Sequence, residues 1–296
     1  MSEELLQSAP VIGPRIYQQI TNFAYDHCGV DLRRGKEQLV SVRLGKKMRE
    51  LGCSSFENYF ALVEQDRTGQ ALTAMIDALT TNYTSFLREA GHFEFMKQEI
   101  LPTLLNRERI QIWSAASSTG EEIFSILFTL LDHYSLPSDS REAAARLKVR
   151  GTDISSRALR AAEAGVYSED RLEGLPAGWL RRYFLRGQGS QQGYYRVKPE
   201  VRRMAEFGRF NLVEPHRERQ QQYPLIFCRN VMIYFDRQTQ EKVVQTLAEH
   251  LEPDGYLFIG HSESLNGISH QLKYVRPAVF RKVSGGKSIL PIRGAR

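Results

Sequence analysis

The 296-residue sequence lacks several features that would place it in common protein classes. Its three cysteines, Cys28, Cys53 and Cys228, are odd in number and far apart, and they form no C-x-x-C pair. Reduced thiols in a cytoplasmic protein are the simplest interpretation of this pattern. The seven histidines show neither H-E-x-x-H nor H-x-x-E-H spacing, so we expect no metal centre.

Long apolar runs are also missing. No stretch approaches the length of a transmembrane helix, and the composition, 42% hydrophobic and 25% charged, is that of an ordinary soluble protein. The first residues lack the basic start and apolar core of a signal peptide. We therefore expect a cytoplasmic protein without membrane insertion, built from one large domain and a smaller one.

A glycine-rich phosphate loop is absent from the place where one would be expected. Residues 110–113 suit a buried strand, 118–120 suit the mouth of a helix where side-chain oxygens cap free N–H groups, and Glu121 and Glu122 fall in the first helical turn. The spacing G-x-G-x-x-G is missing, and two carboxylates would repel a phosphate. A neutral or cationic ligand, with a ribose hydroxyl or a sulfonium, therefore fits better than a dinucleotide.

Positive charge is present and concentrated. The net charge is +6, and residues 33–49 carry seven Lys or Arg against one acid, while residues 181–209 carry eight against two. Such clustering favours an acidic partner, although a solvated helix face explains each segment equally well.

The chain changes character along its length. Residues 14–81 show only helical patterns and predict a small helical domain, and 82–109 form a linking segment with a helix near 90–105. From residue 110, seven strand candidates alternate with helices, which predicts a doubly wound α/β sheet over 110–283. The last two strands have no helix between them, so an antiparallel pairing is expected at one edge. A glycine-rich stretch near 184–204 predicts an inserted antiparallel β-subdomain, and 284–296 should form a basic tail.

Polar residues follow four consecutive strand candidates. They are Glu121 and Glu122, Asp153, Asn211 (followed by the apolar Leu212), and the run from Arg229 and Asn230 to Tyr234. Each has an ordinary explanation alone: a helix cap, a turn residue, an ion pair, a core aromatic. Their joint placement after successive strands favours a binding site, because ligands collect at the carboxyl ends of such sheets.

Five motifs together resemble the CheR family of methyltransferases. They are Asn82-x-Thr84-x-Phe86-x-Arg88, Trp113 to Glu122, Asp153-Ile154, Asn211-Leu212 and Phe227 to Phe235. The resemblance implies a helical domain, an S-adenosylmethionine-dependent class I methyltransferase domain and a small β-subdomain. It also implies a cofactor site lined by Asn82, Thr84, Arg88, Glu122, Asp153, Asn211, Leu212, Arg229 and Asn230, with Arg88 and Tyr234 nearest the transferred methyl. Ile123-Phe124 replaces the family's usual Pro-Tyr.

The resemblance implies methyl esterification of glutamate side chains in the cytoplasmic domain of bacterial chemoreceptors. A glutamate carboxylate is ionised at neutral pH, so the reaction needs no general base. Segment 33–49 and the β-subdomain are the expected receptor contacts, and we expect a monomer. A nucleic-acid methyltransferase is disfavoured, because methylation of base amines typically uses an Asp/Asn-Pro-Pro-aromatic motif after strand four, and Asn230 is followed directly by Val-Met-Ile. A non-catalytic signalling scaffold, or a carboxyl methyltransferase for another acidic signalling protein, remains open.

Overall fold

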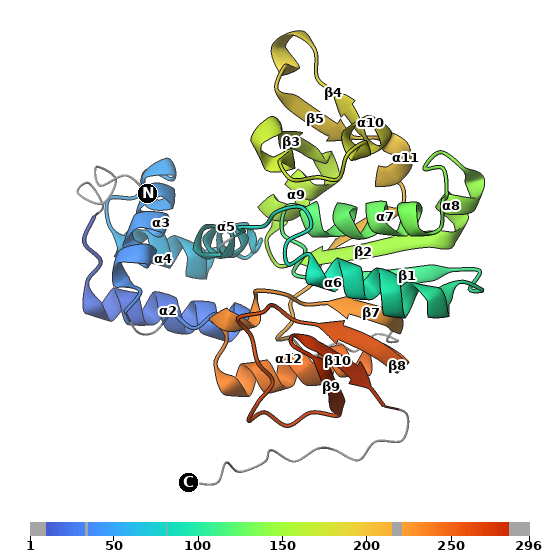
Figure 1. The fold of residues 1–296 in the computed structure, drawn as a ribbon. Coiled ribbons are helices and arrows are strands. Elements are labelled where there is room, and N and C mark those ends of the chain that lie inside the picture. Colours follow the sequence, from blue (N-terminus) through green and yellow to red (C-terminus); the bar gives the residue numbers. More distant parts are fainter. Residues whose placement is uncertain (1–9, 33–34, 81, 215–220, 284–296) are drawn as a thin grey trace.

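The computed structural model describes residues 10–32, 35–80, 82–214 and 221–283, and the chain folds into a helical domain and a larger α/β domain (Figure 1). The expected basic tail, 284–296, lies outside the described residues, as do Arg33 and Arg34 of the basic segment. Among the described helices, none combines the length and the apolar character needed to cross a membrane.

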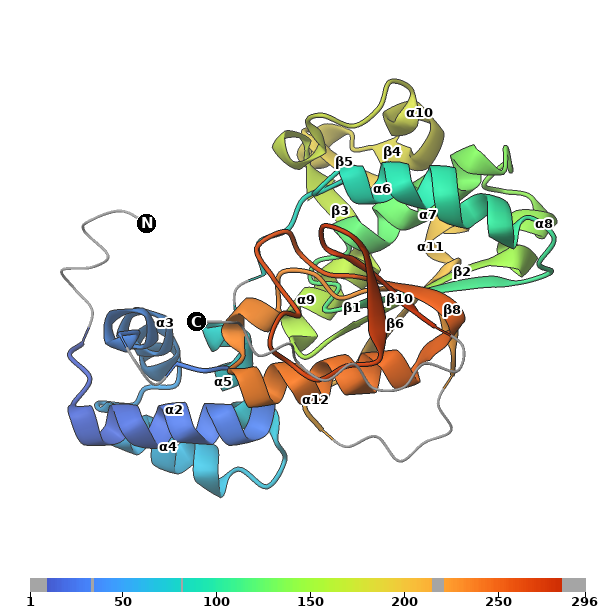
Figure 2. The same ribbon diagram turned by 60° about the horizontal axis from the view of Figure 1, so that its bottom comes forward.

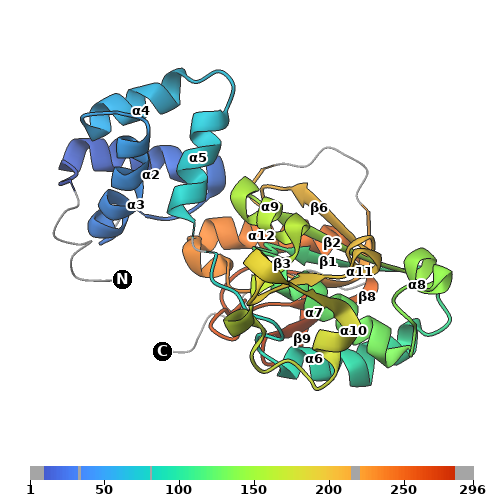
Figure 3. The ribbon, with the colours of Figure 1, turned by 90° about the horizontal axis from the view of Figure 1, so that it is seen from above.

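In the described part of the N-terminal domain the helices are α2 (Pro14–Cys28), α3 (Glu37–Glu50), α4 (Phe56–Gln65) and α5 (Gln70–Leu79). Apolar residues recur four apart in α3, at Val40, Leu44 and Met48, and this stripe is buried in the domain's own core. Gly29 ends α2 with a left-handed backbone, φ 70°. Figures 2 and 3 show the domain beside the sheet, with α5 on the side of the α/β domain.

The α/β domain begins with α6 (Gly91–Phe95), which continues as a π-helical turn (Met96–Ile100) and a 3₁₀ turn (Leu101–Leu104). Its seven strands are β1 (Ile110–Ala115), β2 (Leu147–Asp153), β6 (Ala205–Arg209), β7 (Tyr223–Phe227), β8 (Leu251–Phe258), β9 (Leu272–Arg276) and β10 (Val279–Lys282). The spatial order is β6-β2-β1-β7-β8-β10-β9. Five strands are parallel, and β10 pairs antiparallel with both β8 and the edge strand β9. The predicted seven-stranded, doubly wound class is confirmed.

Alternation along the strands fills two separate cores. In β1, Ile110 and Ile112 join the apolar cluster that contains α7 (Glu121–His133) and the 91–104 helical segment. Trp113 and Ala115 join a second cluster with α12 (Arg237–Glu249). Helices therefore cover both faces of the sheet, as Figure 1 shows. This layering leaves the carboxyl ends of the parallel strands free to form a site.

A second, three-stranded antiparallel sheet has the order β3-β5-β4, with β3 (Val166–Ser168), β5 (Tyr194–Val197) and β4 (Phe184–Arg186). It projects above α7 together with α10 (Trp179–Tyr183) and α11 (Pro199–Arg202) (Figure 1). The expected insertion, 184–204, contains β4 and β5 but omits β3. A three-residue strand directly after α9 (Ser156–Ala164) and Gly165 is too short to show alternation in sequence. Helix α8 (Arg141–Arg146) was likewise not predicted.

Candidate functional site

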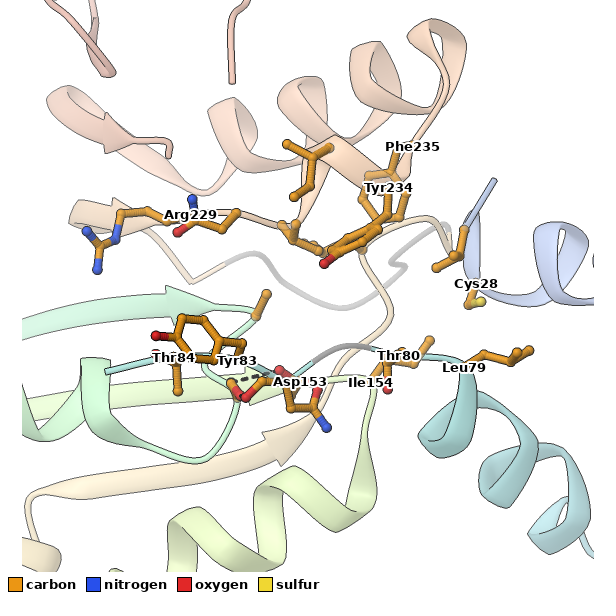
Figure 4. Close-up of a pocket in the computed structure, with 18 of the residues that line it drawn as sticks. Cys28, Leu79, Thr80, Tyr83, Thr84, Asp153, Ile154, Arg229, Tyr234 and Phe235 are labelled. Carbon is orange, nitrogen blue, oxygen red and sulfur yellow. Dashed lines mark hydrogen bonds between the residues drawn. The ribbon is translucent and has the colours of Figure 1, made fainter. Parts of the chain in front are cut away.

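A cavity of about 350 Å³ lies where the carboxyl ends of β1, β2, β6 and β7 meet the helical domain. Every site residue predicted from sequence lines it: Asn82, Thr84, Arg88, Glu122, Asp153, Asn211, Leu212, Arg229, Asn230 and Tyr234. In Figure 4, Arg229 and Tyr234 lie on one side of the cavity, opposite Thr84 and Asp153. The parallel strands bring these residues together because their carboxyl ends share one edge of the sheet.

The helical domain closes one end of the cavity, which the sequence did not reveal. Lys36, Leu39 and Arg43 reach it from the start of α3 and from α3 itself, and Leu79 reaches it from the end of α5. An antiparallel bridge holds this end together: Val30 pairs with Phe235, and within the bridge the Asp31 N–H donates to the Tyr234 carbonyl at 2.8 Å. The basic segment was the one signal in the sequence for this contribution.

Asp153 ties two loops together at the floor of the cavity. Its carboxylate accepts from the backbone N–H of Ser118, after β1, at 2.8 Å, and from that of Ser155, after β2, at 2.9 Å. Ser155, not Asp153, caps helix α9, through the Ala158 N–H. Burial raises the pKa of Asp153, against the effect of the two N–H donors. A carboxylate has about four acceptor positions, so Asp153 keeps capacity to accept from ligand hydroxyls.

The two acids at the mouth of α7 point to different places. Glu122 lines the cavity and accepts from the Ser114 hydroxyl at 2.6 Å and from Arg229 Nε at 2.7 Å. Glu121 is fully buried, accepts from the Thr119 hydroxyl, and forms an ion pair with Arg171. Burial raises the pKa of Glu121, and the Thr119 hydrogen bond and the Arg171 charge oppose this rise.

The turn before α7 differs from the sequence expectation. Gly120 is the N-cap, with φ 96°, and no described side chain caps the helix. The hydroxyl of Ser118 donates instead to the Asn82 carbonyl at 3.0 Å, and that of Thr119 donates to Glu121. The expectation that these hydroxyls cap the helix is therefore wrong. Their hydrogen bonds connect the turn to its neighbours.

Residues 82–88 cross the cavity without regular secondary structure, and side chains from other segments hold their backbone. The Asn82 carbonyl accepts from Ser118, and the Thr84 carbonyl accepts from Arg171 at 3.2 Å. The Leu87 N–H donates to the Ser125 hydroxyl at 2.9 Å, and the Arg88 carbonyl accepts from Arg229 at 2.6 Å. Leu87 and Glu89 both have positive φ, 51° and 58°, on either side of Arg88.

The remaining predicted residues have defined partners. The Asn211 amide donates to the His27 carbonyl and to Glu214, each at 2.7 Å, and so joins the loop after β6 to the end of α2. The Asn230 amide donates to Glu89 at 3.2 Å, and its backbone N–H donates to Glu263 at 3.0 Å. Leu212 is buried. These contacts fix the walls of the cavity.

One group of side chains has the composition of a metal site. Glu89, His92 and His261 can each place one ligand atom within 4.8 Å of the others. Arg229 already brings a positive charge there, with its guanidinium 3.2 Å from His92 Nδ1 and 3.4 Å from Glu89. Burial, with the charge of Arg229, lowers the pKa of His92 to about 4. His92 is therefore neutral at pH 7.

The cavity suits a cofactor that carries hydroxyl groups but no pyrophosphate. Asp153 has spare acceptor capacity, and no glycine-rich loop is present to receive a pyrophosphate. The volume falls within the roughly 300–1,000 Å³ typical of small-molecule sites. Cys28, also in the lining, stays a thiol at neutral pH, because burial raises its pKa to about 11.

Comparison with known proteins gives matches along nearly the whole described chain. The family models "CheR methyltransferase, all-alpha domain" and "CheR methyltransferase, SAM binding domain" match residues 15–80 and 82–280. The chain is 37% identical to the chemotaxis protein methyltransferase of Salmonella typhimurium over 264 residues, 89% of this chain and 88% of that protein. It is 38% identical to chemotaxis protein methyltransferase 2 of Pseudomonas aeruginosa, over 89% and 91% of the two chains. Identity to the Escherichia coli chemotaxis protein methyltransferase is 36%, over 86% of each.

Proposed function

The chain belongs to the CheR methyltransferase family, and from this membership we propose that it transfers the methyl group of S-adenosylmethionine to glutamate side chains of bacterial chemoreceptors. The products are glutamate methyl esters and S-adenosylhomocysteine. One observation carries the proposal: all ten residues assigned from the motifs line a single cavity, although they come from five separate stretches of chain.

Cofactor binding is assigned to the floor and walls of this cavity. Asp153 accepts from ribose hydroxyls, because it keeps acceptor positions beyond the Ser118 and Ser155 N–H groups. Glu122 and Arg229 hold each other and shape the wall, with Asn82, Thr84, Asn211, Leu212 and Asn230 completing the lining. When bound, S-adenosylmethionine supplies an electrophilic methyl on a sulfonium.

Arg88 and Tyr234 are assigned to the acceptor. One N–H group of the Arg88 guanidinium donates to the Tyr83 carbonyl at 2.9 Å, and its other N–H groups are available to hold a carboxylate. Tyr234 lines the cavity on the side opposite Thr84 and Asp153 (Figure 4). The carboxylate is already ionised, so these residues orient it and need not remove a proton. The helical domain limits water at this end, which favours a step that neutralises a cation and an anion.

The acceptor's surroundings are assigned to basic residues of the helical domain. Lys36 and Arg43 line the cavity, and Lys46 is exposed on α3, so an acidic receptor helix would meet positive charge there. A second contact is assigned to β4, an edge strand of the small sheet, where an extended peptide could add a strand. The protein is proposed to act in the cytoplasm as a monomer.

The test uses purified protein, S-adenosylmethionine labelled on the methyl group, and the cytoplasmic fragment of a chemoreceptor. Base-labile label on glutamate side chains is expected. Binding of S-adenosylhomocysteine, measured by calorimetry, serves as the control for an intact cofactor site. Cofactor binding without methyl transfer to any protein would overturn catalysis and leave a binding scaffold. Transfer to another acidic protein, but not to the receptor fragment, would overturn the receptor assignment alone.

A further inference from the structure

Arg171 lies outside the described lining of the cavity but contacts two segments that build it. It belongs to a 3₁₀ turn, Glu169–Leu172, directly after β3 of the small sheet. Its guanidinium forms an ion pair with Glu121 at the mouth of α7 and donates to the Thr84 carbonyl at 3.2 Å. A single side chain thus joins the small sheet, the first helix of the α/β unit and the 82–88 segment.

Glu121, the partner of Arg171 at α7, is a buried acid that needs a positive charge nearby when it is ionised. Glu121 has 0% exposure, and the groups that face it are the Thr119 hydroxyl on its own loop, Arg171, and the buried hydroxyl of Tyr167 from β3. Of these, Arg171 carries the positive charge. Glu121 is the fully buried partner of this ion pair, whereas 36% of the Arg171 side chain is exposed, so removing Arg171 leaves an uncompensated charge at the buried end.

The other partner belongs to a backbone that needs outside support. Leu87 and Glu89 adopt left-handed conformations, and such residues persist only where their surroundings impose them. The small sheet and the turn after β3 support this backbone in two ways, by packing around Phe86 and by a hydrogen bond to the Thr84 carbonyl. Phe86 packs edge-on against Tyr167 of β3, with ring centroids 4.9 Å apart, and against Phe184 of β4 at 5.9 Å, while Arg171 holds the carbonyl two residues earlier.

We propose that Arg171 is a positioning residue for methyl transfer: by holding the Thr84 carbonyl and Glu121 together, it sets the 82–88 segment, and with it Arg88, against the cavity. The role rests on the proposed function, since it acts through the residue assigned to orient the acceptor. Through Arg171, the small sheet would help to position Arg88, in addition to any docking of a peptide at β4.

The first test compares Arg171→Gln, Arg171→Lys and the control Arg141→Gln, which alters an exposed arginine of α8 outside both basic segments. Turnover at saturating cofactor and receptor fragment is divided by the concentration of sites that bind S-adenosylhomocysteine, which removes misfolded protein from the comparison. Arg171→Gln should lower this normalised kcat roughly 10- to 100-fold, as expected for a displaced orienting group. The normalised kcat of Arg171→Lys should lie between those of Arg171→Gln and the wild type, because lysine keeps the charge but not the planar fork of the guanidinium. Arg141→Gln should match the wild type.

The second test does not depend on methyl transfer. Loss of Arg171 raises the pKa of Glu121 further above that of the unfolded chain, so the stability deficit of Arg171→Gln should be small at pH 5 and grow towards pH 8. Thermal melting of Arg171→Gln at both pH values checks this. Measured against Glu121→Gln alone, which lacks the titrating group, the deficit caused by adding Arg171→Gln should not change with pH. Arg171→Lys should keep the wild-type profile.

An unchanged normalised kcat in Arg171→Gln would overturn the positioning role. A stability deficit equal at pH 5 and pH 8 would overturn the assignment of Arg171 as the counter-charge of Glu121. If the wild type binds S-adenosylhomocysteine but transfers no methyl to receptor fragments, the proposed function fails. The melting experiment then still decides whether Arg171 and Glu121 are coupled.

Discussion

Arg229 Nε lies 2.7 Å from Glu122 Oε2, and both side chains are buried. The same guanidinium donates to the Arg88 carbonyl at 2.6 Å. Glu122, therefore, does more than line the cavity: it orients the arginine that holds the backbone of Arg88. Glu122 is thus connected to the backbone of Arg88 through two hydrogen bonds, whereas its neighbour Glu121 pairs with Arg171.

Glu122→Gln should destabilise the protein, because it leaves Arg229 without its closest counter-charge. A lost hydrogen bond to a charged group costs about 1.5–3 kcal/mol, and the second acid, Glu89 at 3.4 Å, keeps the loss within that range. Urea unfolding measures it. The control is Glu142→Gln, whose side chain is 66% exposed and lies 3.9 Å from Arg146; its effect should stay within about 0.5 kcal/mol. Equal effects from the two variants would contradict the buried-pair account.

His92 should make stability depend on pH below neutrality. Its pKa is lowered from 6.5 to about 4, so the unfolded chain binds a proton between these values that the folded protein does not. Stability therefore falls as pH drops through this window, by about 2 kcal/mol between pH 7 and pH 5. Urea unfolding of wild type and His92→Gln at both pH values should show a difference that shrinks on acidification. His27→Gln, in the helical domain, serves as the control, and a constant difference for His92→Gln would refute the assignment.

Gly120 combines a left-handed backbone with close neighbours. At φ 96°, a Cβ would lie 2.9 Å from both the Tyr167 hydroxyl oxygen and Ala162 Cβ. Gly120→Ala should cost about 3 kcal/mol, from backbone strain and overpacking together. Gly52→Ala is the matched control, since Gly52 has φ 69° but open space around it, and it should cost only about 1 kcal/mol. Thermal or urea unfolding compares the two, and equal losses would show that the neighbours adapt.

The sequence predicted the large sheet well, and the physical reason is visible in β1 and β7. Their apolar runs are long enough to show burial, and in parallel strands the polar residues that follow converge at one edge. Asp153 and Tyr234 could be placed in one site for this reason. Strand β3 could not be predicted, because three residues carry no period.

Pairings between distant side chains were also beyond the sequence. Glu122 and Arg229 were each predicted to line the cavity, but nothing in their local patterns indicates that they bond to each other. Arg171 was not among the predicted site residues, because a lone arginine in an irregular stretch is usually a surface residue. Its importance follows from Glu121, whose complete burial only the fold reveals.

Lys46 should affect the receptor without affecting the cofactor. It is exposed on α3, the helix that also brings Arg43 to the cavity, so Lys46→Glu should repel an acidic receptor helix. We expect a higher KM for the receptor fragment and an unchanged affinity for S-adenosylhomocysteine. The KM should rise further at lower salt concentration, because the repulsion is then screened less. Arg67→Glu, exposed between α4 and α5, is the matched charge reversal and should leave KM unchanged. An unchanged KM in Lys46→Glu would mean that this face is merely solvated.

Arg88 should contribute mainly to turnover. Its side chain meets the cavity from a backbone fixed on both sides, at the Leu87 N–H by Ser125 and at its own carbonyl by Arg229, so truncation leaves the segment in place. Arg88→Ala should lower kcat on the order of 10²-fold while stability changes by less than about 1 kcal/mol. Methyl-transfer kinetics and urea unfolding measure the two effects, with exposed Arg109→Ala as the control. Arg88→Lys should recover part of the rate, because an ammonium attracts the carboxylate but cannot hold both of its oxygens in the planar fork. If Arg88→Ala loses stability in proportion to rate, the arginine supports the segment and does not orient the acceptor.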